Sequence, residues 1–392
     1  EGYAGKYISL GRNIDLDGID WEPVGTATNA FKGNFNGNNH VISNMTIGRE
    51  SEPLDLQYAS LFGYVTNSAE FHNVNLEGVS IFIEPSKSAY AGTLAAFSKV
   101  ESGSNTGTVF NNCHVQGSIN VNTSGSAIAG GLTGFTNQNC VIANCGADVE
   151  MTLNGGNKTV NAGGLVGFTS VKGVTINSYS LGDVFVSSTG SSSAGGFAGG
   201  TNGLIYNCYS MGNLTTSGSS IKAGGFAGSI AAATSVSSAY YMNDGENAEL
   251  DFSGENRGSI NEDTCLGYKQ SALMEVGFRD LLSSNLTETK QTAFASELTA
   301  NGNYENMLSR IDGNFYDWEI KDGAVLLSEK LWVSSEVDTG IFASGSGTQD
   351  DPYFIETEEQ LREFACSLTD KLDYKGIFIS LANNIDITGG DW

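Results

Sequence analysis

Three aspartates near the start of the chain have the spacing that most directly suggests chemistry. Asp15, Asp17 and Asp20 occur in the run Asp-Leu-Asp-Gly-Ile-Asp. Closely spaced carboxylates around a Gly turn are typical of calcium loops, because Ca²⁺ prefers oxygen ligands. The downstream Glu of an EF-hand is missing, and a similar run near the C-terminus has Thr388 where this one has Asp17. The three aspartates are a candidate Ca²⁺ site, with a solvated turn as the alternative.

A polysaccharide lyase or glycosidase would need carboxylates that converge on one face. Between positions 130 and 200 the main acidic residues are Asp148, Glu150 and Asp183, and we expect them at different phases of a repeat. The histidines have no metal-type spacing; they are His40, His72 and His114. We therefore predict no catalytic residues, no enzyme activity and no cofactor apart from the candidate Ca²⁺.

Six cysteines in 392 residues, with no Cys-x-x-Cys pair, are too few for a disulfide scaffold. Cys113, Cys145 and Cys208 each follow an Asn directly. We expect a buried ladder of small residues at these positions, and a disulfide between Cys113 and Cys145 is the alternative.

The composition restricts the classes of partner. The formal net charge of −25 repels nucleic acid, and no apolar run is long enough to span a bilayer. The chain has 51 Gly but only 4 Pro, which indicates many tight turns between ordered segments rather than a flexible linker. Tyr179 and Tyr209 could form a stripe that stacks on glycans, or could pack inward.

A pattern of small-Gly-Gly-Leu/Phe-x-Gly-aromatic recurs about every 32 residues, as in Ala129–Phe135 and Ala162–Phe168. Its last two copies have Gly200 and Ser229 instead of the closing aromatic, which suggests a changed or terminating stack there. The large apolar residues of the pattern are Leu61, Leu94, Leu132, Leu165, Phe197 and Phe226.

A second pattern runs in phase with the first and contains an Asn followed by a Gly four or five positions later. Ser238 continues this series, whose members are Asn44, Asn73, Asn112, Asn144, Asn177 and Asn207. Each period contains two or three short strands, such as Val115–Val121, and no convincing helix. We expect Gly to allow sharp turns with positive φ, and stacked Asn amides to bond between coils.

Such a unit cannot bury its apolar face alone, but stacked copies can, with parallel strands about 4.8 Å apart. A β-propeller blade is longer, and a leucine-rich repeat needs more Leu per unit. The sequence therefore predicts an all-β fold, a right-handed parallel β-helix, with a small C-terminal α+β cap and the start of a following unit.

The Gly-Leu-x-Gly core and strings such as Ile205–Gly212 resemble the GLUG-motif repeat family of bacterial cell-surface proteins, which includes adhesins. The stretch from Trp21 to Gly25 is also similar. The resemblance covers about residues 1–245 and 341–392. It implies a parallel β-helix on an exported protein, and it implies no catalytic residues.

The two ends of the chain match each other, because Tyr3–Asp15 aligns with Tyr374–Asp386 at a constant offset of 371. We predict a β-helix over 1–245, a capping α+β module over 246–335 that ends the stack, and a linker, capping helix and first strands of the next tandem repeat over 336–392. Helices are expected at Ser271–Ser283, around Lys290–Leu298, and at Glu358–Leu368 after a Thr357–Gln360 capping box.

These features favour a structural or adhesive repeat module of a large exported bacterial surface protein or extracellular filament. The expected partners are copies of the chain itself, head-to-tail, either covalent or assembled. The alternative is an adhesin module that binds a glycan or a host protein through loops at 49–58, 98–109 and 186–193. The expected location is the bacterial cell surface.

Overall fold

The computed structural model describes most of the first 286 residues and shorter parts of the remainder. The described residues are 2–66, 68–101, 106–286, 310–311, 315–331, 342–345, 352–358, 360–362, 364 and 378–385. The expected helix around Lys290–Leu298, most of the linker expected from residue 336 on, Thr388 and the end of the 358–368 helix lie outside these residues.

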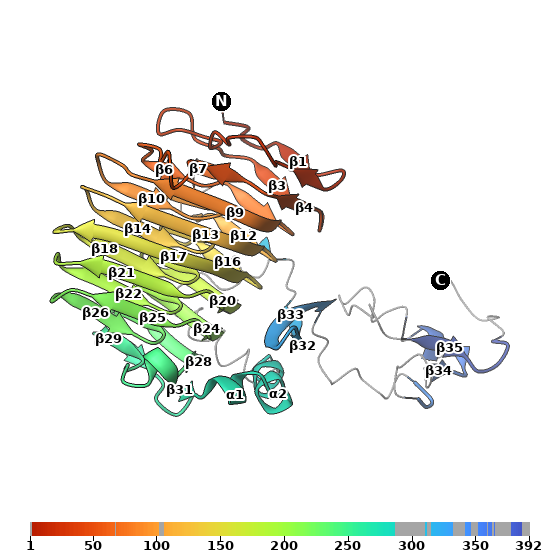
Figure 1. Ribbon diagram of the computed structural model, residues 1–392. Helices are drawn as coiled ribbons and strands as arrows, with labels where there is room; N and C mark the ends of the chain where they lie inside the picture. Colours follow the sequence, from red (N-terminus) through yellow and green to blue (C-terminus); the bar gives the residue numbers. More distant parts are fainter. Residues whose placement is uncertain are drawn as a thin grey trace.

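The chain winds into a parallel β-solenoid in which each strand pairs with the strand one coil further along (Figure 1). Four stacks of strands result. Stack 1 contains β1 (Tyr7–Ser9), β3 (Asn34–Asn36), β8 (Glu70–His72), β12 (Val109–Asn111), β16 (Val141–Ala143), β20 (Gly173–Ser180), β24 (Gly203–Ser210), β28 (Ser235–Met242) and β30 (Ser259–Ile260). Stack 2 contains β2 (Ile14–Asp15), β4 (Val41–Ser43), β5 (Thr46–Ile47), β9 (Asn75–Ile83), β13 (His114–Asn122), β17 (Gly146–Gly156), β21 (Val184–Ser188) and β25 (Leu214–Ser217).

Two further stacks complete each coil. Stack 3 contains β6 (Tyr58–Ala59), β10 (Ala89–Ala91), β14 (Ala127–Gly130), β18 (Val160–Gly163), β22 (Ser192–Gly195) and β26 (Ile221–Gly224). Stack 4 contains β7 (Phe62–Thr66), β11 (Ala95–Lys99), β15 (Thr133–Thr136), β19 (Val166–Thr169), β23 (Ala198–Thr201), β27 (Ala227–Ile230) and β29 (Ser253–Asn256). The predicted parallel β-solenoid is confirmed, with four strands in a regular coil rather than two or three.

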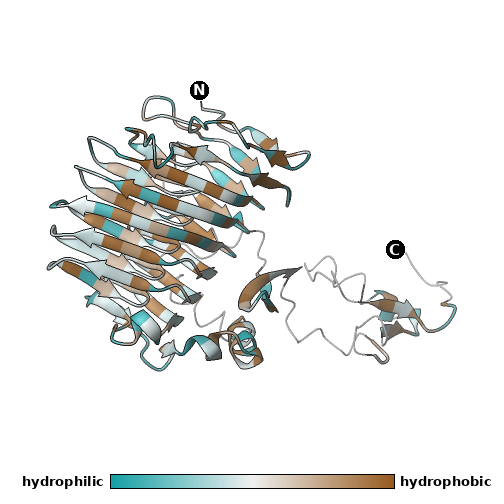
Figure 2. Cartoon of the chain, in the orientation of Figure 1, coloured by the Kyte–Doolittle hydropathy of each residue, from teal (hydrophilic) through white to brown (hydrophobic). Residues whose placement is uncertain are grey.

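The large apolar residues of the first pattern lie above one another in the interior, at the corner between stacks 3 and 4. The Leu132 N–H donates to the Leu165 carbonyl at 2.9 Å, and the rings of Phe197 and Phe226 stack with centroids 4.6 Å apart. Figure 2 shows hydrophobic positions repeated from coil to coil. The burial of these side chains in the same place in every coil supplies the main stabilisation of the stack.

The glycines of the first pattern serve close approach and not positive φ. The expected positive φ occurs instead at glycines that follow the asparagines of the second pattern, such as Gly48 (φ 65°) and Gly78 (φ 63°). A Cβ on Gly131 would lie 2.2 Å from the Gly164 carbonyl oxygen, and one on Gly164 would lie 2.1 Å from that of Gly196. None of these three glycines has a positive φ. The next coil passes so close at this corner that any side chain would collide with its backbone.

The solenoid continues past the predicted boundary at 245. β29 pairs with β27, and both β30 and β31 (Cys265–Tyr268) pair with β28. The Phe252 ring stacks on Phe226 at 4.8 Å, so the inner ladder gains one more member. The loss of the closing aromatic at Gly200 and Ser229 therefore does not end the stack, and the boundary moves to Tyr268.

The following module packs along the side of the solenoid, not across its end. It contains α1 (Gln270–Leu273), α2 (Val276–Ser284) and the antiparallel hairpin of β32 (Tyr316–Lys321) and β33 (Ala324–Leu331). A short 3₁₀ turn, η1 (Gly245–Asn247), lies earlier in the chain, before β29. Its buried residues form a second hydrophobic cluster with outward-facing solenoid residues. The prediction that residues 246–335 end the stack is wrong for the described part of this range.

The C-terminal described residues form a small parallel pair of β34 (Tyr353–Ile355) and β35 (Ile379–Leu381). The expected capping box is present, because the Gln360 N–H donates to Thr357 Oγ1 at 3.2 Å and the Thr357 N–H donates to Gln360 Oε1 at 3.3 Å. Helical residues follow at 358, 360–362 and 364.

Leu165→Ala should lower the free energy of unfolding by about 2–5 kcal/mol, because it leaves a cavity in the inner ladder. Urea or thermal unfolding followed by circular dichroism measures this loss. The matched control is Leu266→Ala, at a position 39 % exposed, where the same change should cost far less. Equal losses for the two variants would contradict the inward placement of Leu165.

Candidate functional site

The structure does not assemble the candidate Ca²⁺ site. One Asp15 carboxylate oxygen accepts from Asn44 Nδ2 at 2.9 Å and from the Asp17 N–H at 3.1 Å, and these bonds lower the pKa of Asp15. Asp20 instead forms an ion pair with Arg49, at 2.6 Å. Among the described residues no group of three or more His, Cys, Asp or Glu side chains could hold a metal ion. The three aspartates therefore act in turns and a surface ion pair.

Five of the predicted asparagines occupy the corner between stacks 1 and 2 with positive φ, from 50° at Asn177 to 54° at Asn144; the other three are Asn73, Asn112 and Asn207. Nδ2 of Asn177 donates to Asn144 Oδ1, and Nδ2 of Asn207 donates to Asn177 Oδ1, both at 2.9 Å. Asn112 donates to Asn73 in the same way, at 2.8 Å. Ser238, φ 50°, takes the next position. A short amide that tolerates the left-handed region thus both turns the chain and ties one coil to the next.

Two departures correct the predicted series. Asn44 lies beside Gly78 and not Asn73, because Ser43 pairs with Glu77 in the sheet. The amide partner of Asn73 in the preceding coil is Asn36, whose Oδ1 accepts a hydrogen bond from Asn73 Nδ2 at 3.2 Å. The amide chain also shifts at Asn144, which donates to Asn111 Oδ1 at 2.9 Å instead of to Asn112.

The side module completes the asparagine stack. The Tyr316 N–H donates to Asn144 Oδ1 at 3.1 Å, and Asn177 Nδ2 donates to the Tyr316 carbonyl at 2.9 Å. At the far end Asn285 Nδ2 donates to Asn207 Oδ1 at 3.0 Å. The amides are thus sealed from water by the module, which makes their hydrogen bonds costly to break.

Tyr179 and Tyr209 point outward from the solenoid, yet both are buried by the side module. Their rings stack with centroids 5.8 Å apart, and the Trp318 ring lies 6.1 Å from the first and 5.8 Å from the second. The Tyr209 hydroxyl donates to the Val325 carbonyl. The tyrosines form neither an open glycan-binding stripe nor part of the solenoid interior.

A groove of about 720 Å³ lies between stack 2 and the hairpin. Its walls carry His114 and Asp148 from the solenoid and Glu319 and Lys321 from β32. His114 Nε2 lies 3.2 Å from Asn112 Oδ1 and Nδ1 lies 3.4 Å from the Tyr179 hydroxyl. Burial lowers the pKa of His114 from 6.5 to about 4, so the imidazole is neutral at physiological pH.

The module is also attached near the start of the solenoid. Arg310 Nε and Nη2 both lie 3.1 Å from Glu70 Oε1, and Nη2 donates to the Gly107 carbonyl at 2.5 Å. Burial raises the pKa of Glu70, but His72 and Arg310 together outweigh burial and hold this pKa below its usual value.

Acidic residues come closer than the sequence indicated. Glu150 and Asp183 directly precede Met151 and Val184, which pair in neighbouring coils, so these two carboxylates share a phase. Asp183 is bonded to the next coil, where the Asn213 N–H donates to its Oδ1 at 2.8 Å. The expectation that these two fall at different phases is wrong, and Asp183 links its coil to the next one.

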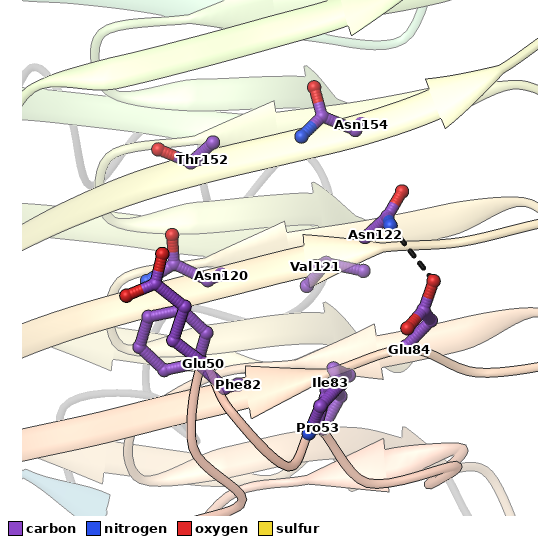
Figure 3. Close-up of a pocket in the computed structure, with 10 residues that line it drawn as sticks. All are labelled: Glu50, Pro53, Phe82, Ile83, Glu84, Asn120, Val121, Asn122, Thr152 and Asn154. Carbon is purple, nitrogen blue, oxygen red and sulfur yellow. Dashed lines mark hydrogen bonds between the residues drawn. The ribbon is translucent and has the colours of Figure 1, made fainter.

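A shallow pocket of about 220 Å³ opens on the outer face of stack 2 (Figure 3). Glu50, Glu84 and the Phe82 ring line one side, and outward amides from the next coils line the other. Asn122 Nδ2 donates to Glu84 Oε1 at 3.0 Å. The pocket thus combines carboxylates, amides and one aromatic face.

Half-buried aromatic rings form a second outward feature, which we call the aromatic row, along stack 4 and its edge with stack 3. The members are Tyr58, Tyr90, Phe97, Phe135 and Phe168. Phe97 stacks on Phe135 at 5.1 Å and Phe135 on Phe168 at 5.8 Å, nearly parallel in both cases. The closing aromatics of the sequence pattern signalled this row, but their outward direction depends on strand alternation within each coil.

The five cysteines among the described residues are buried free thiols. Cys113, Cys145 and Cys208 belong to the inner core, and the Cys145 thiol donates to the Ala143 carbonyl at 3.1 Å. Burial raises the pKa of Cys140 to about 12. The alternative disulfide between Cys113 and Cys145 is not formed.

Comparisons with known proteins give the fold and little more. No known protein family matches the chain. A provisionally named Gly-rich membrane protein of Evansella cellulosilytica is 35 % identical over 77 residues, which is 20 % of this chain and 8 % of that protein. A crystal structure of a provisionally named immunoglobulin A1 protease from Bacteroides ovatus matches with a TM-score of 0.51 and 20 % identity, over 72 % of this chain and 82 % of that one. Among the described residues, no helix has the length and apolar character needed to cross a membrane.

Asn177→Gly should lower the free energy of unfolding by about 1–3 kcal/mol, because it leaves buried partners unpaired while preserving the positive φ. Asn177→Ala should cost about 1 kcal/mol more, through the strain of a Cβ in the left-handed region. Urea unfolding measures both. Asn39→Ala, at an exposed turn with φ 58°, isolates the strain. An Asn177→Gly variant as stable as wild type would exclude a stabilising role for the amide.

Stability should fall as pH drops from about 6.5 to 4, because the unfolded chain binds a proton at His114 that the folded chain excludes. His114→Gln removes this effect. Between pH 7 and pH 4 its free energy of unfolding should fall by about 1–3 kcal/mol less than that of wild type. Urea unfolding at several pH values measures the difference. Identical pH slopes for the two proteins would contradict the buried neutral imidazole.

Proposed function

We propose that this chain is a structural and adhesive repeat module of a large exported bacterial surface protein, located outside the cell. The observation that carries the proposal is the uninterrupted stack of coils, seven strands deep in stack 4. With about 4.8 Å between neighbouring coils, the seven strands of stack 4 span ~29 Å. Every coil is tied to the next by backbone hydrogen bonds, inner ladders and stacked amides, so the module resists bending.

Further features support this role. The second hydrophobic cluster clamps the side module along the stack, from the Arg310–Glu70 contact to the Asn285–Asn207 bond. The net charge of −25 keeps such modules soluble and apart from one another along their sides. The Gly-Leu-x-Gly repeats support an assignment to the GLUG-motif repeats. In this proposal the chain itself performs no catalysis.

Immunogold labelling of intact source cells with antibody against the purified chain tests the location. We expect label on the cell surface and, by negative-stain microscopy of the purified protein, a short rod. The control is cells permeabilised before labelling, which should gain little signal. Label that appears only after permeabilisation would contradict the proposal.

The aromatic row favours a second candidate function, the binding of glycans. The rings face one another along the row, so together they offer a sugar chain an apolar strip made of their outward edges. The amide- and carboxylate-lined pocket in Figure 3 offers hydrogen-bond partners on another face of the same coils.

Phe97→Ala with Phe135→Ala should reduce retention on immobilised polysaccharides at least tenfold, because the apolar strip loses two adjacent rings. Affinity electrophoresis against a panel of polysaccharides measures retention. The matched control is Phe185→Ala, a half-buried outward ring on stack 2. If the double substitution leaves retention unchanged, or if wild type is retained on no polysaccharide, the aromatic row does not bind glycans.

A further inference from the structure

The pocket in Figure 3 is built on three consecutive coils of stack 2. Phe82 pairs with Asn120 in the next coil, and Asn120 pairs with Thr152 in the coil after that. Side chains two positions apart on a strand face the same side of the sheet, so a second outward row lies beside the first. The members of this second row in the pocket are Glu84, Asn122 and Asn154.

A loop of the preceding coil forms the remaining wall and is bonded to the sheet. The Leu54 N–H donates to the Phe82 carbonyl at 3.2 Å, and the Glu84 N–H donates to the Leu54 carbonyl at 2.9 Å. The loop carries Glu50 into the lining of the pocket. It belongs to the segment 49–58, one of the candidate binding loops in the sequence. Because its backbone is fixed to the strand, the wall is formed before any ligand binds.

The Phe82 ring has no ring beside it in the adjoining coils, unlike the members of the aromatic row. Gly48 lies next to it in the preceding coil, where a Cβ would be 2.2 Å from the Phe82 carbonyl oxygen. Asn120 lies next to it in the following coil. The ring is half-buried, and Figure 3 shows one of its faces on the outer side of stack 2. Such a face can stack on the apolar C–H face of a sugar ring.

The polar side chains of the pocket offer both donors and acceptors. The carboxylates of Glu50 and Glu84 accept hydrogen bonds, whereas the amide of Asn120 both donates and accepts. The bond drawn in Figure 3, from Asn122 Nδ2 to Glu84 Oε1 at 3.0 Å, holds one carboxylate in place. A hydroxyl group can donate to a carboxylate and accept from an amide at the same time. Adjacent hydroxyls of a sugar therefore match this lining.

Charge and volume narrow the class of ligand further. The ten lining residues, all within the described part of the chain, include two Glu and no Lys, Arg or His, so a uronate or a sulfate is repelled. A cation is attracted, but it cannot accept a hydrogen bond from the amides. The volume of about 220 Å³ lies below the ~300–1,000 Å³ of sites for drug-sized ligands, so the pocket suits one ring.

We propose that this pocket binds one neutral pyranose residue of a glycan. The C–H face of the sugar lies on the Phe82 ring, and its adjacent hydroxyls bond to Glu84 and Asn120. The inference rests on the second candidate function, glycan binding, to which it adds the class of sugar and a site separate from the aromatic row.

Titration of the full chain with methyl glycosides, followed by saturation-transfer NMR, tests the pocket. The neutral probes are the methyl glycosides of glucose, galactose, mannose and N-acetylglucosamine, and the charged probes are glucuronic acid and glucosamine. We expect at least one neutral probe to bind with a Kd of about 0.1–10 mM. Its affinity should change little between about 50 and 500 mM NaCl, because the ligand carries no charge.

Phe82→Ala should weaken this binding roughly tenfold or more through loss of the stacking face. Asn120→Ala should do the same by removing an outward amide, and it leaves the ring in place. The matched control is Phe185→Ala, a half-buried outward ring that pairs with Thr152 one coil beyond and does not line the pocket. Its affinity should equal that of wild type. Circular dichroism and thermal melting of each variant check that the solenoid still folds.

The inference is overturned if no neutral probe binds, if only a charged probe binds, or if either Phe82→Ala or Asn120→Ala binds as wild type does. The Phe97→Ala, Phe135→Ala double variant separates the two glycan sites, because it should bind the methyl glycosides with unchanged affinity. Surface label on intact cells together with no glycoside binding would remove the sugar site in this pocket alone and leave the proposed structural module intact.

Discussion

The spacing of about 4.8 Å between successive coils is the constraint on which the whole molecule depends. It requires that whatever one coil presents at a given position is met by its counterpart in the next. At the Gly131–Gly164 corner this excludes any side chain, and at the Asn144–Asn177 corner it selects a residue that adopts positive φ and bonds to its own copy. Glycine therefore occupies the corner where successive coils approach closely, and asparagine occupies the corner where the backbone turns with positive φ.

The same stacking leaves an outward surface along the flank of the solenoid. Outward tyrosines and amides on this flank are covered by the hairpin, which explains why Tyr209 is buried although it points away from the core. The side module therefore protects the flank of the solenoid from water.

The fold could be predicted from the sequence because each repeated residue occupies the same local environment in every coil. The prediction of residue positions failed where the coils are irregular. Asn44 has the right type and spacing but lies within stack 2, between β4 and β5, since the early coils differ in length and only pairing such as Ser43 with Glu77 fixes their register. The position of the side module could not be derived either, because outward residues such as Tyr179 look like core residues in a periodic pattern.

Outward rows follow from stacking as surely as inward ladders do. Phe97, Phe135 and Phe168 form a row because their strands are in register, and the row ends where the Phe168 ring lies over Gly200, whose own Cβ would meet that ring at 2.8 Å. A change of one residue type in one coil thus sets the length of a surface feature without disturbing the coils beneath it. A solenoid can in this way vary its outer surface from repeat to repeat while its interior stays constant, which is the property that a surface-displayed repeat module requires.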